Sequence, residues 1–118
     1  MSQLRELTIS VRLLGHATIV DLEGRIDLTN STLLRSTLFD ALPVATRLAV
    51  NMTGINYVDS SGLATLLEVL KKARDLHKGF VLFGLSPKVY DVLKLTHLLG
   101  IFQIFDSEEH ALKGNTGS

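Results

Sequence analysis

The chain has 118 residues, enough for one domain with a hydrophobic core, and 46% hydrophobic against 20% charged residues is typical of a globular protein. Twelve basic and twelve acidic side chains give a formal net charge of zero, which argues against a nucleic-acid-binding protein, because phosphate contacts need a basic surface. Cysteine is absent, which excludes disulfides. Neither a secretory leader nor a membrane-spanning apolar run is evident, so we expect a cytoplasmic protein without membrane insertion.

Two strands are predicted at the start of the chain. Apolar and polar residues alternate over residues 7–14, which indicates a strand with one buried face. Residues 17–22 indicate a second strand, and the short turn between the two predicts an antiparallel hairpin. Glu23 and Gly24 are expected to end this second strand.

A helix is predicted next, with Thr29 or Asn30 as its cap and Pro43 as its end. Its apolar face follows the three-to-four spacing of an amphipathic helix and consists of Leu33, Leu34, Thr37, Leu38, Ala41 and Leu42.

The middle of the chain predicts a buried strand and the longest helix. Residues 47–52 are short and mostly apolar, as in a parallel strand covered by helices. A helix of about residues 60–78 follows, with Thr65 among the side chains expected to face water and Gly79 expected to end it in a left-handed conformation. Its predicted buried stripe consists of Leu63, Leu66, Leu67, Leu70, Ala73 and Leu76.

The last third predicts two more strand–helix pairs. Residues 80–83 form a buried strand, and the pair Ser86-Pro87 indicates an N-cap followed by proline in the first helical position. Residues 101–105 predict a short final strand. A helix of about residues 109–113 is expected after it, with its N-terminal cap at residues 107–109. The apolar face of the third helix contains Val89, Val92, Leu93 and Leu95.

The order β-β-α-β-α-β-α-β-α predicts a single α/β domain over residues 1–118, with a mixed, mostly parallel sheet of about five strands and about four helices. Its core covers about residues 7–113, and residues 114–118 are expected to form a flexible tail. Functional loops of such sheets lie beyond the carboxyl ends of the strands. We therefore expect three loops to meet at one edge: residues 24–30, 57–63 and 84–89.

None of the common catalytic or cofactor motifs is present. The segment Val58-Asp59-Ser60-Ser61-Gly62 lacks the first glycine of a G-x-S-x-G nucleophile elbow. Glycine-rich phosphate loops are absent, and the histidines are scattered without the spacing of zinc ligands: His16, His77, His97 and His110. The sequence therefore predicts no enzyme, no metal site and no cofactor.

The segment Asp59-Ser60-Ser61-Gly62 lies where a strand leads into a helix N-terminus. Backbone N–H groups are unpaired there, and the helix dipole favours negative charge. Either serine is a good helix cap, Asp59 is favourable at the dipole, and Gly62 permits a close approach of helix and sheet. From these residues alone, a purely structural role and a chemical role are both open.

Two runs of sequence resemble the STAS domains, and in particular the bacterial anti-sigma factor antagonists. The run Ile55-Asn56-Tyr57-Val58-Asp59-Ser60-Ser61-Gly62-Leu63 resembles the family signature, and Val20-Asp21-Leu22-Glu23-Gly24-Arg25-Ile26-Asp27 resembles its strand and Gly-x-Ile/Leu-Asp turn. The order of elements agrees from about residue 7 to residue 113. Ala64 and Arg25 depart from the pattern, in which a second glycine and an acidic residue are common, and this bears on the identity of the partner.

This resemblance implies a regulatory protein that binds an anti-sigma factor, which is also a serine kinase, and so releases a sigma factor. The kinase would phosphorylate Ser60, with Ser61 as the second choice, and a serine phosphatase would reverse the reaction. The oligomeric state stays open, with the monomer favoured, and the sequence does not determine whether a small-molecule ligand binds. An alternative within the same fold is a constitutive STAS subunit of a lipid-transport or sensory assembly. The residues implied at the partner surface are Asp27, Thr29, Asp59, Ser60, Ser61, Gly62, Leu63, Leu85 and Val89.

Overall fold

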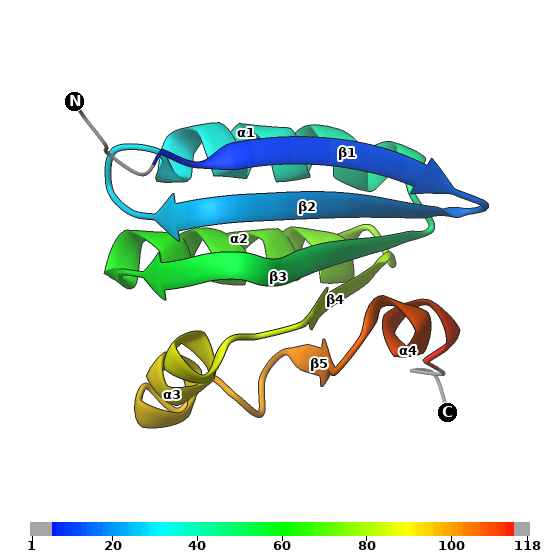
Figure 1. The fold of residues 1–118 in the computed structure, drawn as a ribbon. Coiled ribbons are helices and arrows are strands. Elements are labelled where there is room, and N and C mark those ends of the chain that lie inside the picture. Colours follow the sequence, from blue (N-terminus) through cyan, green and yellow to red (C-terminus); the bar gives the residue numbers. More distant parts are fainter. Residues whose placement is uncertain (1–5, 115–118) are drawn as a thin grey trace.

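A computed structural model describes residues 6–114, so most of the tail expected to be flexible lies outside the described residues. In this part of the chain, five strands form one sheet in the order β1-β2-β3-β4-β5 (Figure 1). The strands are β1 (Thr8–Leu14), β2 (Ala17–Ile26), β3 (Arg47–Val58), β4 (Gly79–Phe83) and β5 (Gln103–Phe105). The helices are α1 (Ser31–Ala41), α2 (Ser60–Asp75), α3 (Pro87–Leu95) and α4 (Glu108–Lys113), with a 3-10 turn, η1, at Leu42–Val44. The predicted fold class and element order are confirmed.

The sheet is antiparallel only at its first pair of strands. β1 pairs with β2 in antiparallel register, and the pairs β2–β3, β3–β4 and β4–β5 are parallel. The turn at Gly15 and His16 is too short for a crossover, so the first two strands form the predicted hairpin. Each later strand is reached through a helix, as parallel pairing requires.

Helices cover both faces of the sheet. Alternate residues of β3, among them Leu48 and Val50, belong to the main core under α1, α2 and α3. Ala49 points to the opposite face, where it packs in a small second cluster with Ala111 of α4. Figure 1 shows α1 and α2 next to each other behind the sheet and α4 in front of it.

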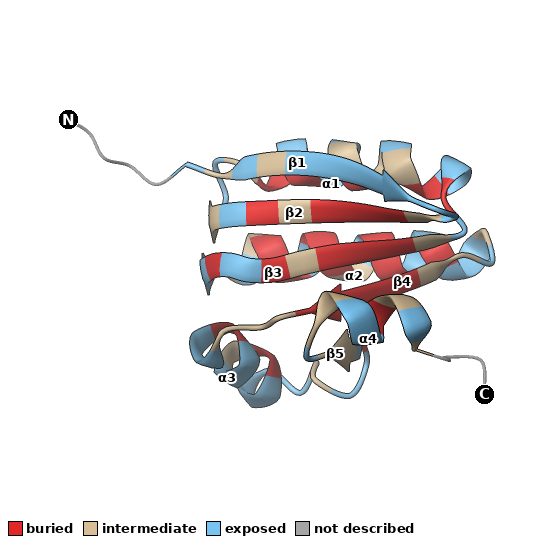
Figure 2. Cartoon of the chain, turned by 45° about the vertical axis from the view of Figure 1, so that its right-hand side comes forward, coloured by how far each residue is buried: buried red, intermediate tan, exposed pale blue. Residues whose placement is uncertain are grey.

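The edge strand β1 is exposed along nearly its whole length (Figure 2). Val11 and Leu13 are 51% and 76% exposed, so the predicted buried face is wrong for this half of the strand, whereas Leu7 and Ile9 are half-buried against the main core. Leu33 of α1, predicted on the apolar face, is likewise 55% exposed. The reason is the position of the core, which lies between the helices and the inner strands and reaches the edge strand only near its start, at Ile9.

β2 continues through Glu23 and Gly24 to Ile26, so the predicted strand end is wrong. The register with β3 shifts at Glu23 and again between Gly24 and Arg25, which marks a bulge. Gly24 has a φ of 112°, and a Cβ atom there would overlap the backbone of Glu6. The glycine therefore allows an irregular strand to continue.

Helix α2 begins at Ser60 as predicted but ends at Asp75. The left-handed residue after it is His77, with a φ of 57°, and Gly79 is the first residue of β4 instead of the helix end. Thr65 is 4% exposed, which corrects its predicted place on the water-facing side. The predicted stripe is buried at Leu63, Leu66, Leu70 and Ala73 and half-buried at Leu67 and Leu76.

The later helix caps are confirmed. The Ser86 and Ser107 hydroxyls accept hydrogen bonds from the backbone N–H groups of Val89 and His110. Three details differ from the prediction, because β5 begins at Gln103, α4 begins at Glu108 and Leu95 is 78% exposed.

The loops at the carboxyl ends of the strands do not all meet. β3 pairs with β4 only as far as Asn51 opposite Phe83, and it continues beside β2 to Val58. Gly84 therefore lies against Thr53, six residues before Asp59, which is about 20 Å along an extended strand. Only the loops of residues 24–30 and 57–63 come together, while α3 packs against the projecting end of β3.

Candidate functional site

Asp59 is the N-cap residue of α2. Its Oδ1 atom accepts hydrogen bonds from the backbone N–H groups of Ser61 and Gly62, at 2.9 and 3.1 Å. Burial is the largest single effect on this carboxyl group and raises its pKa, but its hydrogen bonds together outweigh burial and hold the pKa below its usual range. Asp59 is therefore an ionised cap that occupies the amides at the start of the helix.

Gly62 places the first turn of α2 directly on the sheet. A Cβ atom there would lie 2.7 Å from Ile26 Cγ2 and 2.9 Å from Val58 Cγ1. Both neighbours are buried side chains at the ends of β2 and β3. The glycine thus has the structural role that the sequence left open, and it holds Ser60 and Ser61 close to the ends of both strands.

The two serines are in different environments. The Ser61 hydroxyl donates a 2.6 Å hydrogen bond to Asp59 Oδ1, and the residue is half-buried. Ser60 is exposed, and its hydroxyl makes no hydrogen bond to any residue between 6 and 114. A hydroxyl that another protein modifies has to be accessible, and Ser60 meets this condition better than Ser61.

The loop between β2 and α1 is organised by Asp27 and Asn30. Asp27 Oδ1 accepts hydrogen bonds from the hydroxyl and the backbone N–H of Thr29, at 2.6 and 3.0 Å. The hydroxyl bond is the main reason that the pKa of Asp27 lies below its ordinary value. Asn30 occupies the cap position of α1, but its amide bonds the Arg25 carbonyl and the Asp27 N–H, so it braces the loop and does not cap the helix.

Two hydrogen bonds join this loop to the start of α2, one to the Asp59 side chain and one between backbone groups. The Leu28 N–H donates to Asp59 Oδ2 at 3.2 Å, and the Asp59 N–H donates to the Ile26 carbonyl at 3.1 Å. The Leu28 side chain is 76% exposed. Two carboxylates, an accessible hydroxyl and an exposed leucine therefore share one end of the molecule, the end marked by the arrowheads of β2 and β3 in Figure 1.

Sequence reasoning missed how three residues contribute to this surface, namely Leu28, Arg25 and Tyr57. Leu28 was part of the predicted loop, but nothing in the local pattern showed that its backbone bonds Asp59 while its side chain faces solvent. Arg25 lies over the ring of Tyr57, with Cζ 4.3 Å from the ring centroid. The two residues are 32 positions apart, so only the parallel register of β2 and β3 brings them together.

Several residues implied at a partner surface lie in the interior. Leu63 is 8% exposed and Val89 is 2% exposed, and both belong to the main core. Leu85 is half-buried against that core in the separate β4–α3 loop. Leu63 and Val89 therefore support the fold and are not available to a partner, which corrects their implied place at the partner surface.

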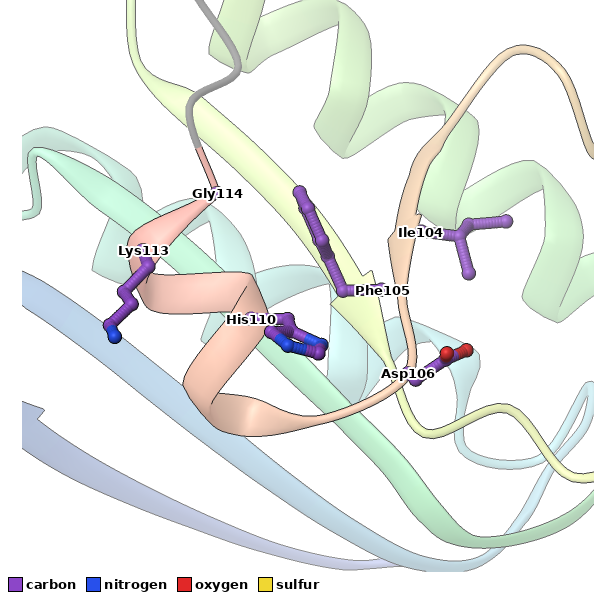
Figure 3. Close-up of a pocket in the computed structure, with 6 residues that line it drawn as sticks. All are labelled: Ile104, Phe105, Asp106, His110, Lys113 and Gly114. Atoms are coloured by element: carbon purple, nitrogen blue, oxygen red, sulfur yellow. The ribbon is translucent and has the colours of Figure 1, made fainter.

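Elsewhere, a shallow pocket lies between β5 and α4, with Phe105 and His110 on its wall (Figure 3). Its Phe105 side chain packs against the small second cluster, and the pocket shares no lining residue with the loop of residues 57–63. Within residues 6–114, no group of three or more acidic, histidine or cysteine side chains is arranged to hold a metal ion. No helix in this range is long and apolar enough to cross a membrane.

Comparison with known proteins relates the sequence to one family. The sequence profile of the STAS domain matches residues 8–111. The anti-sigma-B factor antagonist of Listeria monocytogenes is 32% identical over 68 residues, which cover 58% of this chain and 59% of that protein. The protein named "Putative anti-sigma factor antagonist BtrV" from Bordetella bronchiseptica is 31% identical over 94 residues, which cover 79% of this chain and 81% of that protein.

Solved structures show the same fold. An anti-sigma factor antagonist from Mycobacterium paratuberculosis superposes with a TM-score of 0.86 at 20% identity, covering 96% of this chain and 97% of that one. The Bacillus cell fate determinant SpoIIAA in its phosphorylated form superposes with a TM-score of 0.71 at 20% identity, covering 90% and 97%. At this level of identity the likeness establishes the architecture alone.

Proposed function

The chain belongs to the STAS domain family, and from this premise we propose that it is an anti-sigma factor antagonist switched by phosphorylation of Ser60. In this proposal it binds an anti-sigma factor that is also a serine kinase, so that a sigma factor is released in the cytoplasm. The observation that carries the proposal is the exposed hydroxyl of Ser60, which makes no hydrogen bond within residues 6–114, next to Ser61, whose hydroxyl is already bonded to Asp59. The protein acts by association and is the substrate of another protein's catalysis.

The covalent step is a phosphoryl transfer to Ser60. The hydroxyl oxygen forms an ester bond with the γ-phosphorus of ATP held by the kinase, the hydroxyl proton is released and ADP leaves. A serine phosphatase reverses the change by hydrolysis of the ester with water. Because the Ser60 hydroxyl has no partner among the described residues, no hydrogen bond within the fold has to break before the transfer.

Phosphorylation adds about −1.5 to −2 charges to a surface that already carries Asp59 and Asp27, the second of which is ion-paired with Arg25. The amides of Ser61 and Gly62 are occupied by Asp59 and cannot hold the phosphate without displacing its carboxylate. The new charge therefore projects towards solvent, where the fold tolerates it. In a protein interface the same charge loses its hydration, and an uncompensated buried charge costs about 3–5 kcal/mol, which weakens binding by more than about a hundredfold.

Binding of Ser60 variants tests this proposal. The probe is each purified anti-sigma factor encoded in the genome that carries this chain, titrated by calorimetry against wild type, Ser60→Ala and Ser60→Asp. We expect Ser60→Ala to bind like wild type and Ser60→Asp to lose binding. Equal binding by both variants contradicts the switch and favours the alternative, a constitutive subunit of a lipid-transport or sensory assembly.

Incubation of the same anti-sigma factors with ATP identifies the modified residue. Mass spectrometry is expected to find phosphate on wild type and on Ser61→Ala, but not on Ser60→Ala. If Ser60→Ala retains the phosphate and Ser61→Ala loses it, the phosphorylated residue is Ser61 and not Ser60.

A further inference from the structure

Arg25 and Tyr57 form an ordered, exposed pair at the carboxyl ends of β2 and β3. The guanidinium lies over the phenol ring at 4.3 Å, and its Nε atom lies 3.3 Å from Asp27 Oδ2. The arginine side chain is 42% exposed and Tyr57 is 43% exposed. The ring on one side and the carboxylate on the other hold the cation in one place while a large part of it faces solvent.

The outer nitrogens of this guanidinium are free within the described part of the chain. The ion pair with Asp27 involves Nε, which is shielded from solvent and is not aligned for a hydrogen bond. Nη1 and Nη2 donate no hydrogen bond to any residue between 6 and 114. In contrast, Arg12 uses all three of its nitrogens on Asp21 and Glu108. Arg25 is thus positioned but has donors left for another molecule.

Arg25 is also connected to the Ser60 loop, residues 57–63. Asp27 faces Arg25 with Oδ2 and holds Thr29 with Oδ1. Leu28 directly follows Asp27, and its backbone N–H donates to the carboxylate of Asp59. Asp59 in turn caps the helix that begins at Ser60. A continuous set of contacts therefore runs from the Arg25–Tyr57 pair to the Ser60 loop, and a partner that covers this loop lies next to the pair.

We propose that the Arg25–Tyr57 pair determines partner specificity by binding an aspartate or glutamate side chain of the anti-sigma factor. This inference rests on the proposed function and names the chemistry of the partner. A planar guanidinium whose two outer nitrogens make no hydrogen bond within residues 6–114 suits bidentate binding of a carboxylate. Arginine and tyrosine are also the residue types that most often dominate the energetics of protein interfaces, where they anchor the partner in a fixed position.

A charge series tests the proposal with the anti-sigma factor that binds wild type. Arg25→Gln removes the charge and is expected to weaken binding about tenfold, and Arg25→Glu, which opposes the partner carboxylate, more than about a hundredfold. Tyr57→Leu, which removes the stacking ring, is expected to resemble Arg25→Gln, whereas Tyr57→Phe retains binding because the ring remains. Urea unfolding of each variant checks that the domain is folded.

Arg35 provides a matched control. Its guanidinium lies 4.4 Å from the ring centroid of Phe39, its Nε is 3.0 Å from Glu68, and its side chain is 45% exposed. It has the same stacked and ion-paired chemistry but lies between α1 and α2, away from the Ser60 loop. We expect Arg35→Glu to change the dissociation constant by less than about threefold.

The outcomes separate this inference from the proposed function. If wild type binds, Ser60→Asp does not, and Arg25→Glu binds like Arg35→Glu, the specificity role of Arg25 is overturned while the switch stands. If Arg25→Glu alone loses affinity, and an Asp→Arg or Glu→Arg substitution in the anti-sigma factor restores it, the recognition is supported. If no anti-sigma factor of the genome binds wild type, the proposed function fails and the inference falls with it.

Discussion

The Asp59 carboxylate accepts a hydrogen bond from the Leu28 backbone N–H at 3.2 Å, which joins two loops 31 residues apart in the sequence. One oxygen of this carboxylate serves the β2–α1 loop and the other caps α2 at Ser61 and Gly62. The side chain therefore sets the position of the exposed Leu28 relative to Ser60. A change at Asp59 should affect helix stability and loop order together.

Replacement of Asp59 by alanine is expected to lower the free energy of unfolding by about 1–2 kcal/mol, because it removes the cap of the longest helix. Amide hydrogen exchange at Leu28 should become faster at the same time, since its acceptor is lost. Asp59→Asn is the control, because the amide oxygen still accepts one of these bonds and part of the stability remains. Unchanged exchange at Leu28 in Asp59→Ala would contradict the link between the loops.

Gly62→Ala should destabilise the domain by about 1–3 kcal/mol, because the new methyl group overlaps Ile26 and Val58 in the core. Gly100→Ala is the matched control, since a Cβ atom there meets nothing within 4 Å, and we expect a change within about 0.5 kcal/mol. Urea denaturation measures both variants. Equal stability of the two would show that α2 moves away from the sheet without cost.

The acid stability of the domain depends in part on Asp21. The Arg12 guanidinium, which bonds it at 2.6 and 3.0 Å, holds the pKa of Asp21 below its ordinary value of 3.8, and Asn51 contributes another hydrogen bond. A group with a lowered pKa stabilises the fold fully above its unfolded value and loses this contribution as the pH falls through the folded value.

We therefore expect the free energy of unfolding to decrease between about pH 5 and about pH 2, and to decrease less in Asp21→Asn than in wild type. Denaturant titrations at a series of pH values measure this difference. The same acid-dependent decrease in both proteins would show that the ion pair with Arg12 does not contribute.

Arg47 anchors the short helix α4 to the sheet. Its guanidinium donates to the carbonyl groups of Ala111 and Gly114, at 2.8 and 3.0 Å. Arg47→Met should accelerate amide exchange throughout α4 and leave α1 unchanged, because these bonds satisfy carbonyl groups at the helix end. Lys113→Met is the control, since the Lys113 ion pair with Glu109 is mostly exposed and should contribute nothing measurable.

Local patterns in the sequence determined the fold class, the order of elements and most helix starts. The caps at Ser86 and Ser107 could be predicted because a capping side chain bonds amides two or three residues away. At the start of α2 the sequence offered the serines as caps, but the capping side chain is that of Asp59. The same local character made the Asp59-Ser60-Ser61-Gly62 loop recognisable. Errors arose where burial depends on distant elements, as in the exposed strand β1 and the buried Thr65.

Tertiary structure alone decided which loops meet and which side chains face solvent. Parallel pairing of β2 with the long strand β3 places Arg25 over Tyr57 and Leu28 beside Asp59. The shorter pairing of β3 with β4 keeps the third loop away from this surface. These contacts join residues about thirty positions apart, and their geometry follows from strand register and length, which no short run of residues specifies.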